Sequence, residues 1–250
     1  MLHRLPDLEI TGEIVMKKNI AIIPARAGSK RINNKNIIDL CGKPLIAWTI
    51  EAALESDLFD DVLVSTDSEE IAEIAITHGA IAPFLRNKST SDDYTPVSEA
   101  TVEALIRMEE YKTCKYKNVI QLMPNCPCRT AVDIGNAYEN FSSSGNNFQI
   151  SVFEYGWMNP WWAMGIETEN RRPRPLFPDA LKQRSQDLEK LYCPTGSVWV
   201  AKADALKAEK TFYGKDYSIF PLSWQSAVDI DNQEDLNMAE AVFYIRELIK

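Results

Sequence analysis

Residues 22–36 read IIPARAGSKRINNKN, and this stretch indicates both the class of fold and the place where a ligand binds. Its start belongs to a short apolar run, residues 19–24 (NIAIIP), bounded by charge and proline, which predicts a buried strand. The loop that follows holds small residues and four cations: Arg26, Lys30, Arg31 and Lys35. Small residues let backbone N–H groups approach a phosphate, and cations neutralise its charge. The stretch therefore predicts a strand followed by an anion-binding loop.

Two common phosphate-binding motifs do not occur in this loop. The GxxxxGK[ST] pattern of a Walker A loop is missing, and Gly28 stands alone instead of within a GxGxxG dinucleotide fingerprint. The alternative to a ligand loop is a solvated basic turn after an edge strand. The concentration of cations in a chain with 27 Lys plus Arg against 36 Asp plus Glu favours the ligand loop.

Strand and helix patterns alternate along the first two-thirds of the chain. Residues 44–55 have helical spacing with a proline in the first turn. Further strands are predicted at residues 61–66, 80–84 and 119–123, and further helices at residues 68–79, 97–110 and 131–141. Because strands alternate with helices, we expect βαβ units, which means an α/β fold with a mostly parallel twisted sheet and flanking helices.

The alternation breaks at about residues 142–195, which we interpret as a small insertion or dimerisation subdomain. Within it, residues 156–164 (GWMNPWWAM) admit two interpretations. The aromatic rings either stack on a sugar or close a pocket, or they pack at a dimer interface or in a subdomain core, which we favour. The basic residues at 171–174 indicate a solvated loop, with a reach into a partner subunit's active site as the alternative.

The two ends of the chain complete the predicted organisation. Residues 1–16 are expected to be an N-terminal extension, and residues 17–250 a single domain. Beyond the insertion, strands are predicted at residues 196–201 and 227–230, and a helix at residues 232–249 with Asn232 as its cap.

Composition and charge exclude several classes of partner. A formal charge of −9 gives the chain no overall attraction for nucleic acid or for an anionic membrane surface. We see no apolar run of the length that a membrane span or a signal peptide needs. The five cysteines are odd in number and irregularly spaced, so we expect reduced thiols and a cytoplasmic location instead of a disulfide framework.

Asp229 and Asp231 are a candidate metal site near the far end of the chain. On an extended strand, residues two apart point to the same face. Two hard oxygen ligands there could hold Mg²⁺ and bridge it to triphosphate oxygens. The alternative is a turn followed by a helix cap, and the two residues alone leave both interpretations open.

A series of short motifs connects these features. They are IPAR at 23–26, GSK at 28–30, KN at 35–36, GKPL at 42–45, VSTD at 64–67, FLR at 84–86 before SDD at 91–93, Gln121 with Pro127-x-Arg129, RSQDL at 184–188, and DID at 229–231 before EDL at 234–236. In this order, over about residues 18–245, the series resembles the acylneuraminate cytidylyltransferase family, whose members make CMP-activated sialic acids and related nonulosonic acids.

The resemblance implies a fold, a reaction and a set of site residues. The fold would be a Rossmann-like, GT-A-like nucleotidyltransferase, and CMP would pass from CTP to the anomeric hydroxyl of a nonulosonic acid with release of pyrophosphate. The implied catalytic residues are Arg26 and Lys30, which would stabilise phosphoryl charge, and Asp229 and Asp231, which would hold Mg²⁺. The implied nucleotide-binding residues are Ala25, Gly28, Ser29, Lys35, Asn36 and Arg86. The implied acceptor-sugar residues are Gln121, Arg129, Gln186 and Tyr192.

Two segments depart from the sialic acid pattern and leave the sugar open. The usual Gln-Pro-Thr-Ser-Pro-Leu-Arg is replaced by QLMPNCPCR at residues 121–129, and Pro-Thr-Gly at 194–196 stands where Asn-Gly is common. By contrast, FLR at 84–86 and RSQDL at 184–188 look closer to the pseudaminic acid branch. The resemblance also implies a homodimer, with the aromatic insertion as its contact surface.

Three other functions remain as alternatives. The nearest is a ketodeoxyoctonate cytidylyltransferase, which shares the fold and the chemistry but uses a different acceptor. A nucleotide-sugar-dependent glycosyltransferase also presents Asp-x-Asp to a metal, although such enzymes normally carry it in mid-chain. The third alternative is a non-catalytic nucleotide-binding module.

Overall fold

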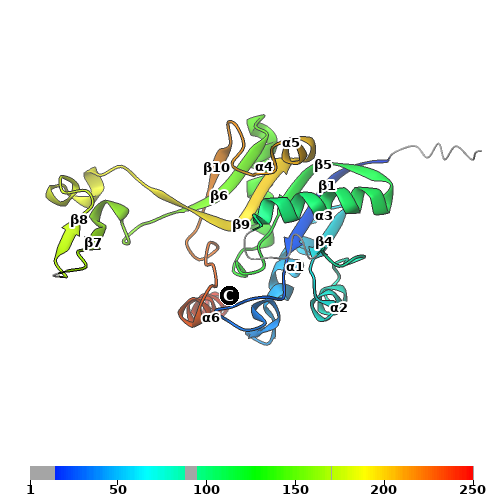
Figure 1. Ribbon diagram of the computed structural model, residues 1–250, viewed down its shortest axis with the longest axis horizontal. Coiled ribbons are helices and arrows are strands. Elements are labelled where there is room, and N and C mark those ends of the chain that lie inside the picture. Colours follow the sequence, from blue (N-terminus) through cyan, green and yellow to red (C-terminus); the bar gives the residue numbers. More distant parts are fainter. Residues whose placement is uncertain (1–14, 88–94, 170, 250) are drawn as a thin grey trace, which may run out of the picture.

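The apolar run predicted as the first strand forms the buried end of β1 (Val15–Pro24), whose last six residues are all buried. This strand is the second from one edge of the central sheet in a computed structural model that describes residues 15–87, 95–169 and 171–249 (Figure 1). Two residues of the predicted N-terminal extension, 15 and 16, belong to β1. The rest of that extension, and the SDD motif at 91–93, lie outside the described residues.

Six strands form the central sheet in the order β10-β6-β9-β5-β1-β4. Besides β1 they are β4 (Asp61–Ser65), β5 (Cys114–Gln121), β6 (Phe148–Glu154), β9 (Tyr192–Lys202) and β10 (Ser218–Leu222). The pairs β1/β4, β1/β5 and β6/β10 are parallel, and β9 is antiparallel to both its neighbours. Because β4 and β5 flank β1 on opposite sides, the chain switches direction across the sheet at the carboxyl end of β1, where α/β proteins bind ligands.

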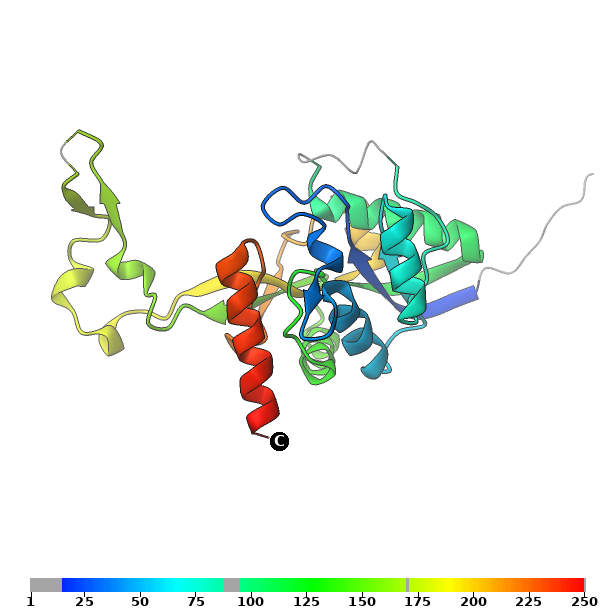
Figure 2. The same cartoon turned by 90° about the horizontal axis from the view of Figure 1, so that it is seen from below.

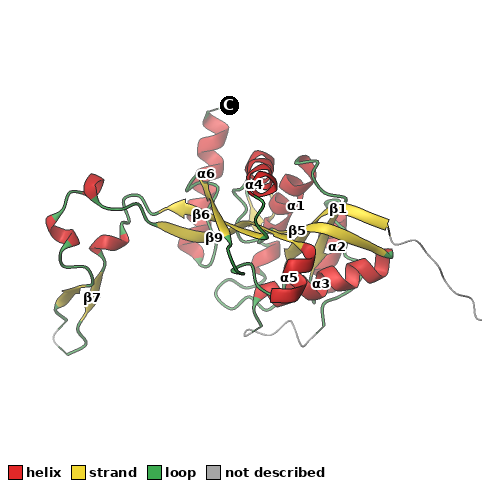
Figure 3. Cartoon of the chain, turned by 90° about the horizontal axis from the view of Figure 1, so that it is seen from above, coloured by secondary structure: helices red, strands yellow, loops and turns green. Residues whose placement is uncertain are grey.

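Helices cover both faces of this sheet (Figure 3). One face packs against α1 (Leu45–Glu55), α2 (Glu69–Thr77) and α4 (Ala131–Ser144), and the other against α3 (Val97–Lys112) and α5 (Ala203–Glu209). The layers confirm the predicted α/β fold with a mostly parallel sheet.

The C-terminal helix α6 (Gln233–Leu248) begins as predicted at Asn232. The Asn232 side chain accepts hydrogen bonds from the backbone N–H groups of Glu234 and Asp235, and Asp235 closes the capping box. Leu236, Ala239 and Val242 bury one side of α6 in a third apolar cluster. This packing places α6 between the projecting arm and the rest of the fold (Figure 2).

An arm of residues 155–191 projects from the sheet between β6 and β9 (Figure 1). It contains the small antiparallel pair β7 (Met164–Ile166) and β8 (Pro173–Pro175). It also contains the short 3₁₀ helices η3 (Pro160–Trp162), η4 (Ala180–Lys182) and η5 (Ser185–Asp187). The segments before and after the arm, Phe148–Glu154 and Tyr192–Lys202, pair with each other in the sheet, so only the arm itself stands apart.

The predicted helices and the strands at 19–24, 61–66, 119–123 and 196–201 are confirmed, whereas two predicted strands are wrong. Residues 80–84 contribute one isolated bridge, Ile81 to Leu63, because Pro83 has no N–H to extend the pairing. Residues 227–230 form no strand, because side-chain hydroxyl groups of β9 donate hydrogen bonds to the backbone carbonyls at the start of this segment and just before it. Thr195 Oγ1 donates to the Ala227 carbonyl at 3.2 Å, and Ser197 Oγ donates to the Ser226 carbonyl at 2.9 Å.

None of the helices within the described ranges combines the length and the apolar character needed to span a bilayer.

Candidate active site

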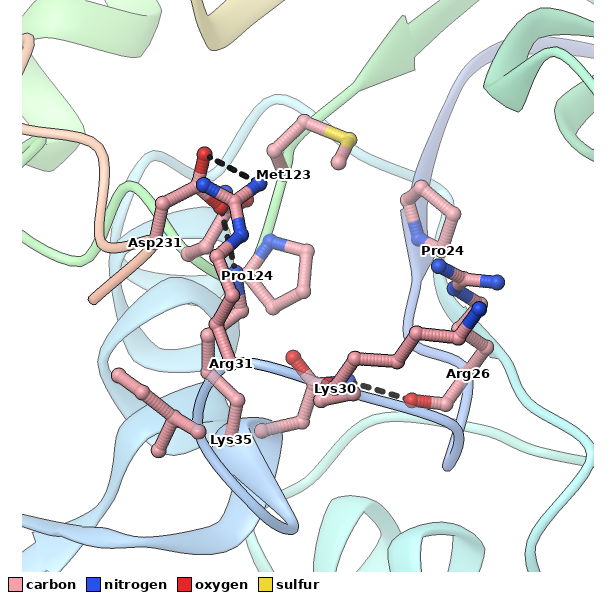
Figure 4. Close-up of a pocket in the computed structure, with 12 residues that line it drawn as sticks. Pro24, Arg26, Lys30, Arg31, Lys35, Met123, Pro124 and Asp231 are labelled. Carbon is pink, nitrogen blue, oxygen red and sulfur yellow. Dashed lines mark hydrogen bonds and ion pairs between the residues drawn. The ribbon is translucent and has the colours of Figure 1, made fainter. Parts of the chain in front are cut away.

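A cavity of about 330 Å³ lies at the carboxyl ends of β1 and β5 (Figure 4). Three segments supply its walls: the loop after β1 with the short 3₁₀ helix η1 (Lys35–Ile37), the loop after β5, and the approach to α6. The lining residues are Pro24, Arg26, Ser29, Lys30, Arg31, Ile32, Lys35, Asn36, Met123, Pro124, Asn125 and Asp231. The cavity therefore occupies the switch point at which the parallel strands diverge.

The basic loop is held to the sheet at its start and to η1 at its end. Ala25 is fully buried, and its N–H donates to the Ser65 carbonyl of β4 at 2.9 Å. Asn36 is buried in η1, and its Nδ2 donates to the Arg26 carbonyl at 2.9 Å. Between these points Gly28 and Lys30 are exposed, and Lys30 lines the cavity while Gly28 does not.

The cationic loop meets Asp231 across the cavity. Lys35 Nζ lies 3.0 Å from Asp231 Oδ1 and also donates to the Ile230 carbonyl at 2.7 Å. Arg31 Nη2 lies 3.2 Å from Asp231 Oδ2. In Figure 4 these three side chains face one another on one side, and Arg26 and Lys30 lie on the other. Segments about 200 residues apart in sequence therefore build one charged site.

Asp229 lies beside the cavity and is held by Asn125. The Asn125 amide donates to Asp229 Oδ1, and the Asn125 carbonyl accepts the N–H of Ile230 at 2.8 Å. The pKa of Asp229 is raised to about 6, first because surrounding protein atoms displace water from the carboxylate and second because Asp231 nearby carries the same charge. Since the Asp229 side chain still reaches solvent, burial accounts for only part of this rise. The two carboxylates are close enough to repel each other.

Asp229 and Asp231 suit Mg²⁺ when a nucleotide completes its coordination. Across residues 15–87, 95–169 and 171–249 there is no cluster of three or more His, Cys, Asp or Glu side chains that could hold a metal. Mg²⁺, however, is commonly bound by one or two carboxylates plus substrate phosphates. Two mutually repelling carboxylates beside a cavity of about 330 Å³ that is lined by cations match that donor set.

The other predicted site residues lie outside the cavity lining. Arg86 is buried behind the carboxyl end of β4, where its Nη2 donates to the Ser65 carbonyl at 2.7 Å. Gln121 is fully buried at the end of β5 and accepts the Thr101 hydroxyl at 2.7 Å. Arg129 is also buried, and its Nη2 donates to the Met123 carbonyl from behind the loop.

Gln186 and Tyr192 lie on the arm side of the molecule. Gln186 lines a separate hollow of about 280 Å³ at the base of the arm, together with Tyr155 and Lys190. Tyr192 is the first residue of β9 and is exposed. Within one copy of the described chain, neither residue lines the cavity that holds Asp231.

Sequence reasoning missed Met123, Pro124 and Asn125 as lining residues. The one available signal was the departure of residues 121–129 from the sialic acid pattern. Met123 is packed against Gly196, where an added Cβ would lie 2.6 Å from Met123 Cγ. This contact fixes one wall of the cavity.

Cys126 and Cys128 follow in the same loop and are fully buried. Burial raises the pKa of each thiol to about 12, so both stay protonated and pack as apolar groups.

The fold and the site together define a nucleotidyltransferase, and solved structures share that fold. The structure of CMP:2-keto-3-deoxy-manno-octonic acid synthetase complexed with CTP superposes with a TM-score of 0.68 at 16% identity and covers 92% of this chain and 100% of its own. The 4-diphosphocytidyl-2C-methyl-D-erythritol synthase of Anaerococcus prevotii superposes with a TM-score of 0.62 at 15% identity, covering 92% of this chain and 99% of its own. Such low identities establish the fold alone.

Sequence relatives give the family. Residues 20–242 match the family model described as cytidylyltransferase, and the chain belongs to this family. A pseudaminic acid cytidylyltransferase of Campylobacter jejuni is 37% identical over 228 residues, covering 91% of this chain and 97% of the relative. A CMP-N,N'-diacetyllegionaminic acid synthase of Legionella pneumophila is 33% identical, with the same two coverages. An N-acylneuraminate cytidylyltransferase of Streptococcus agalactiae is 31% identical over 87% of this chain and 51% of its own length.

These matches confirm the family resemblance seen in the motifs, and with it the prediction that the chain is an enzyme.

Proposed function

We propose that this chain transfers CMP from CTP to the anomeric hydroxyl of a nonulosonic acid and releases pyrophosphate. The observation that carries the proposal is the meeting of Arg31 and Lys35 with Asp231 at one cavity, beside Arg26 and Lys30. Its support comes from relatives whose names specify pseudaminic and legionaminic acids and whose lengths are matched to 97%.

In the proposed reaction, the anomeric oxygen forms a bond to the α-phosphorus of CTP. The bond from that phosphorus to the bridging oxygen of the β-phosphate breaks, and pyrophosphate leaves with the electron pair while a base takes the hydroxyl proton. Negative charge grows on the phosphoryl oxygens and on the leaving group. Arg26 and Lys30, which line the cavity, would neutralise that charge.

Mg²⁺ is the cofactor that we propose, with Asp229 and Asp231 as its protein ligands. When bound, the ion would polarise the α-phosphate and offset the charge of the triphosphate. Lys35, which pairs with Asp231 and donates to the Ile230 carbonyl, would keep the carboxylate at the cavity. Asn125 would orient Asp229 through its amide.

For the nucleotide, Ser29, Lys35 and Asn36 line the cavity and Ala25, Gly28 and Arg86 support it from the loop and from β4. For the acceptor sugar, we propose that Gln121 and Arg129 shape the pocket from behind Met123. Gln186 on the arm and Tyr192 at the start of β9 would contribute from a second copy.

A contribution of Gln186 and Tyr192 from a second copy requires a homodimer, and we propose the arm as its contact surface. Large apolar side chains are exposed along the arm: Trp157, Met158, Trp162, Met164, Ile166, Leu176, Phe177 and Leu181. Exposed apolar surface of this extent marks an interaction site, and aromatic and Met residues are enriched at interfaces. We also propose a cytoplasmic location, because all five cysteines are free thiols.

The test is turnover with a panel of acceptors. The purified protein would be incubated with CTP, Mg²⁺ and, separately, pseudaminic, legionaminic, N-acetylneuraminic and ketodeoxyoctonic acids. We expect pyrophosphate release and a CMP-sugar mass with at least one of the first three. Turnover with ketodeoxyoctonic acid alone would establish that alternative, and CTP binding without turnover on any acceptor would favour a non-catalytic module.

A further inference from the structure

Asp67 lies directly after β4, at the edge of the sheet where the basic loop leaves β1. Its side chain is half-buried, and Oδ1 accepts the backbone N–H of Ala27 at 2.9 Å. This bond joins two segments that are 40 residues apart in sequence. Asp67 does not itself line the cavity.

Ala27 is a further point at which the basic loop is fixed, between the anchors at Ala25 and at the Arg26 carbonyl. Its methyl group packs against the apolar cluster beneath the sheet, and its carbonyl accepts the N–H of Ser29 at 2.8 Å. The cavity-lining cations Arg26 and Lys30 flank it in sequence, and Lys30 is exposed. The backbone position of Ala27 therefore contributes, with the anchors at Ala25 and Arg26, to where these two cations begin.

The backbone just before Asp67 is in turn held by Arg86. The chain around it is tied to Arg86, whose N–H donates to the Thr66 carbonyl at 2.7 Å. Arg86 Nε also donates to Ser65 Oγ at 3.2 Å. Burial lowers the pKa of the Arg86 guanidinium, and the nearby carboxylates of Asp67 and Glu103 act in the opposite direction. A carboxylate placed in this way is preorganised to hold the loop.

We propose that Asp67 is a positioning residue of the nucleotide site, which fixes the basic loop through the N–H of Ala27 so that Arg26 and Lys30 face the triphosphate. The inference rests on the proposed function, because that function assigns the cavity to CTP. A displacement of about 1 Å in such groups costs binding and rate without any change in the groups themselves.

Two variants separate the hydrogen bond from the negative charge. Asp67→Ala removes both, whereas Asp67→Asn keeps an oxygen that accepts the N–H of Ala27. We expect Asp67→Ala to raise the Kd and the KM for CTP about tenfold, the effect of losing one hydrogen bond to a charged group, and to lower kcat as well, because Arg26 and Lys30 would also stabilise the charge that grows during the reaction. Asp67→Asn should restore both constants to within about twofold of the unsubstituted protein.

Asp60 offers a matched control at the opposite end of the same strands. Its Oδ2 accepts the backbone N–H groups of Lys18 and Asn19, at 2.7 and 2.9 Å, where β1 enters the sheet. Asp60→Ala should lower the thermal unfolding midpoint at least as much as Asp67→Ala does. Its constants for CTP should stay unchanged, because the bonds that it removes are far from the cavity.

Direct binding of CTP, measured by calorimetry, distinguishes a failure of the proposed function from a failure of the role assigned to Asp67. If the unsubstituted protein bound no CTP, the proposed function would fail. If it bound CTP and Asp67→Ala bound it equally well, only the role of Asp67 would fail. Equal impairment of Asp67→Asn and Asp67→Ala would also overturn that role, because charge and not the hydrogen bond would then be what matters.

Discussion

The two ends of the parallel strands β1, β4 and β5 differ in how far their buried polar side chains are paired. At the amino ends, Asp61 is buried, forms ion pairs with Lys17 and Lys112, and accepts a hydrogen bond from the Tyr116 hydroxyl at 2.5 Å. Burial alone would raise the pKa of Asp61, but the hydrogen bonds from Lys17, Tyr116 and Lys112 lower it overall. Every partner at this end comes from the protein itself.

At the carboxyl ends, several buried polar side-chain atoms have no hydrogen-bond partner among the described residues. Five buried side-chain atoms lack a partner in the part of the chain that the structure describes, and four of them belong to Gln121, Asn125 and Arg129 after β5. Buried polar groups without partners cost free energy. Where they gather at one edge of a sheet, that cost points to a ligand or to ordered water. The two ends therefore differ in whether buried polar side chains find partners among the described residues.

The largest expected effect is on activity and comes from the carboxyl ends. Arg26→Ala removes a cation that lines the cavity, so kcat/KM should fall about 100-fold or more. The unfolding midpoint should stay close to that of the unsubstituted protein. Pyrophosphate release and thermal unfolding measure the two quantities, and normal turnover would show that the basic loop does not serve the reaction.

The reverse result is expected at the amino ends. Asp61→Ala leaves Lys17 and Tyr116 without their shared acceptor, and should lower the free energy of unfolding by about 2–3 kcal/mol. Because the cluster lies far from the cavity, the KM for CTP of the folded variant should not change. Urea unfolding at neutral pH gives the first quantity. A fold as stable as the unsubstituted one would contradict the structural role of this cluster.

The same cluster gives a pH dependence with a defined sign. The pKa of Asp61 is lower in the folded protein than the ordinary value of 3.8, so its ionised form stabilises the fold. That contribution is complete above about pH 5 and is lost as pH falls below 3.8 through the folded-state pKa. In urea unfolding at a series of pH values, the difference between the unsubstituted protein and Asp61→Asn should therefore shrink toward zero on acidification. A difference that grew would reverse the assigned sign.

The smallest effect on stability should come from a buried side chain with a polar atom that has no partner among the described residues. Gln121→Met removes an amide whose Nε2 has no partner among the described residues, and Thr101 keeps its second bond, to the Val97 carbonyl at 3.0 Å. The free energy of unfolding should change by less than about 1 kcal/mol. If Gln121 shapes the acceptor pocket, the KM for the sugar should rise while the KM for CTP stays constant. A large loss of stability would place Gln121 with the structural residues instead.

The parts that sequence reasoning predicted are those with strong local patterns. β1 ends in an unbroken apolar run, α1 begins behind a proline, and Asn232 with Asp235 caps α6. The meeting of the basic loop with Asp231 was also predictable, because the family resemblance linked the two motifs.

The parts that it missed depend on distant partners. Residues 227–230 look like a strand, but the hydroxyls of Thr195 and Ser197 satisfy the backbone at their start. β6 alternates polar and apolar residues, yet it adjoins an aromatic-rich segment and was assigned to the insertion. Asn125 joins the site through bonds to residues about 100 positions away, which no local pattern can indicate.

The close packing of Met123 on Gly196 couples two positions that are far apart in sequence. Since a Cβ at position 196 would lie 2.6 Å from Met123 Cγ, position 196 cannot gain a side chain unless the methionine moves or is replaced. We expect the two positions to vary together among related chains: bulk gained on β9 should be matched by bulk lost after β5. A new shape of this wall would then arise by paired substitution, and a side chain gained at 196 alone would pass through a poorly packed intermediate.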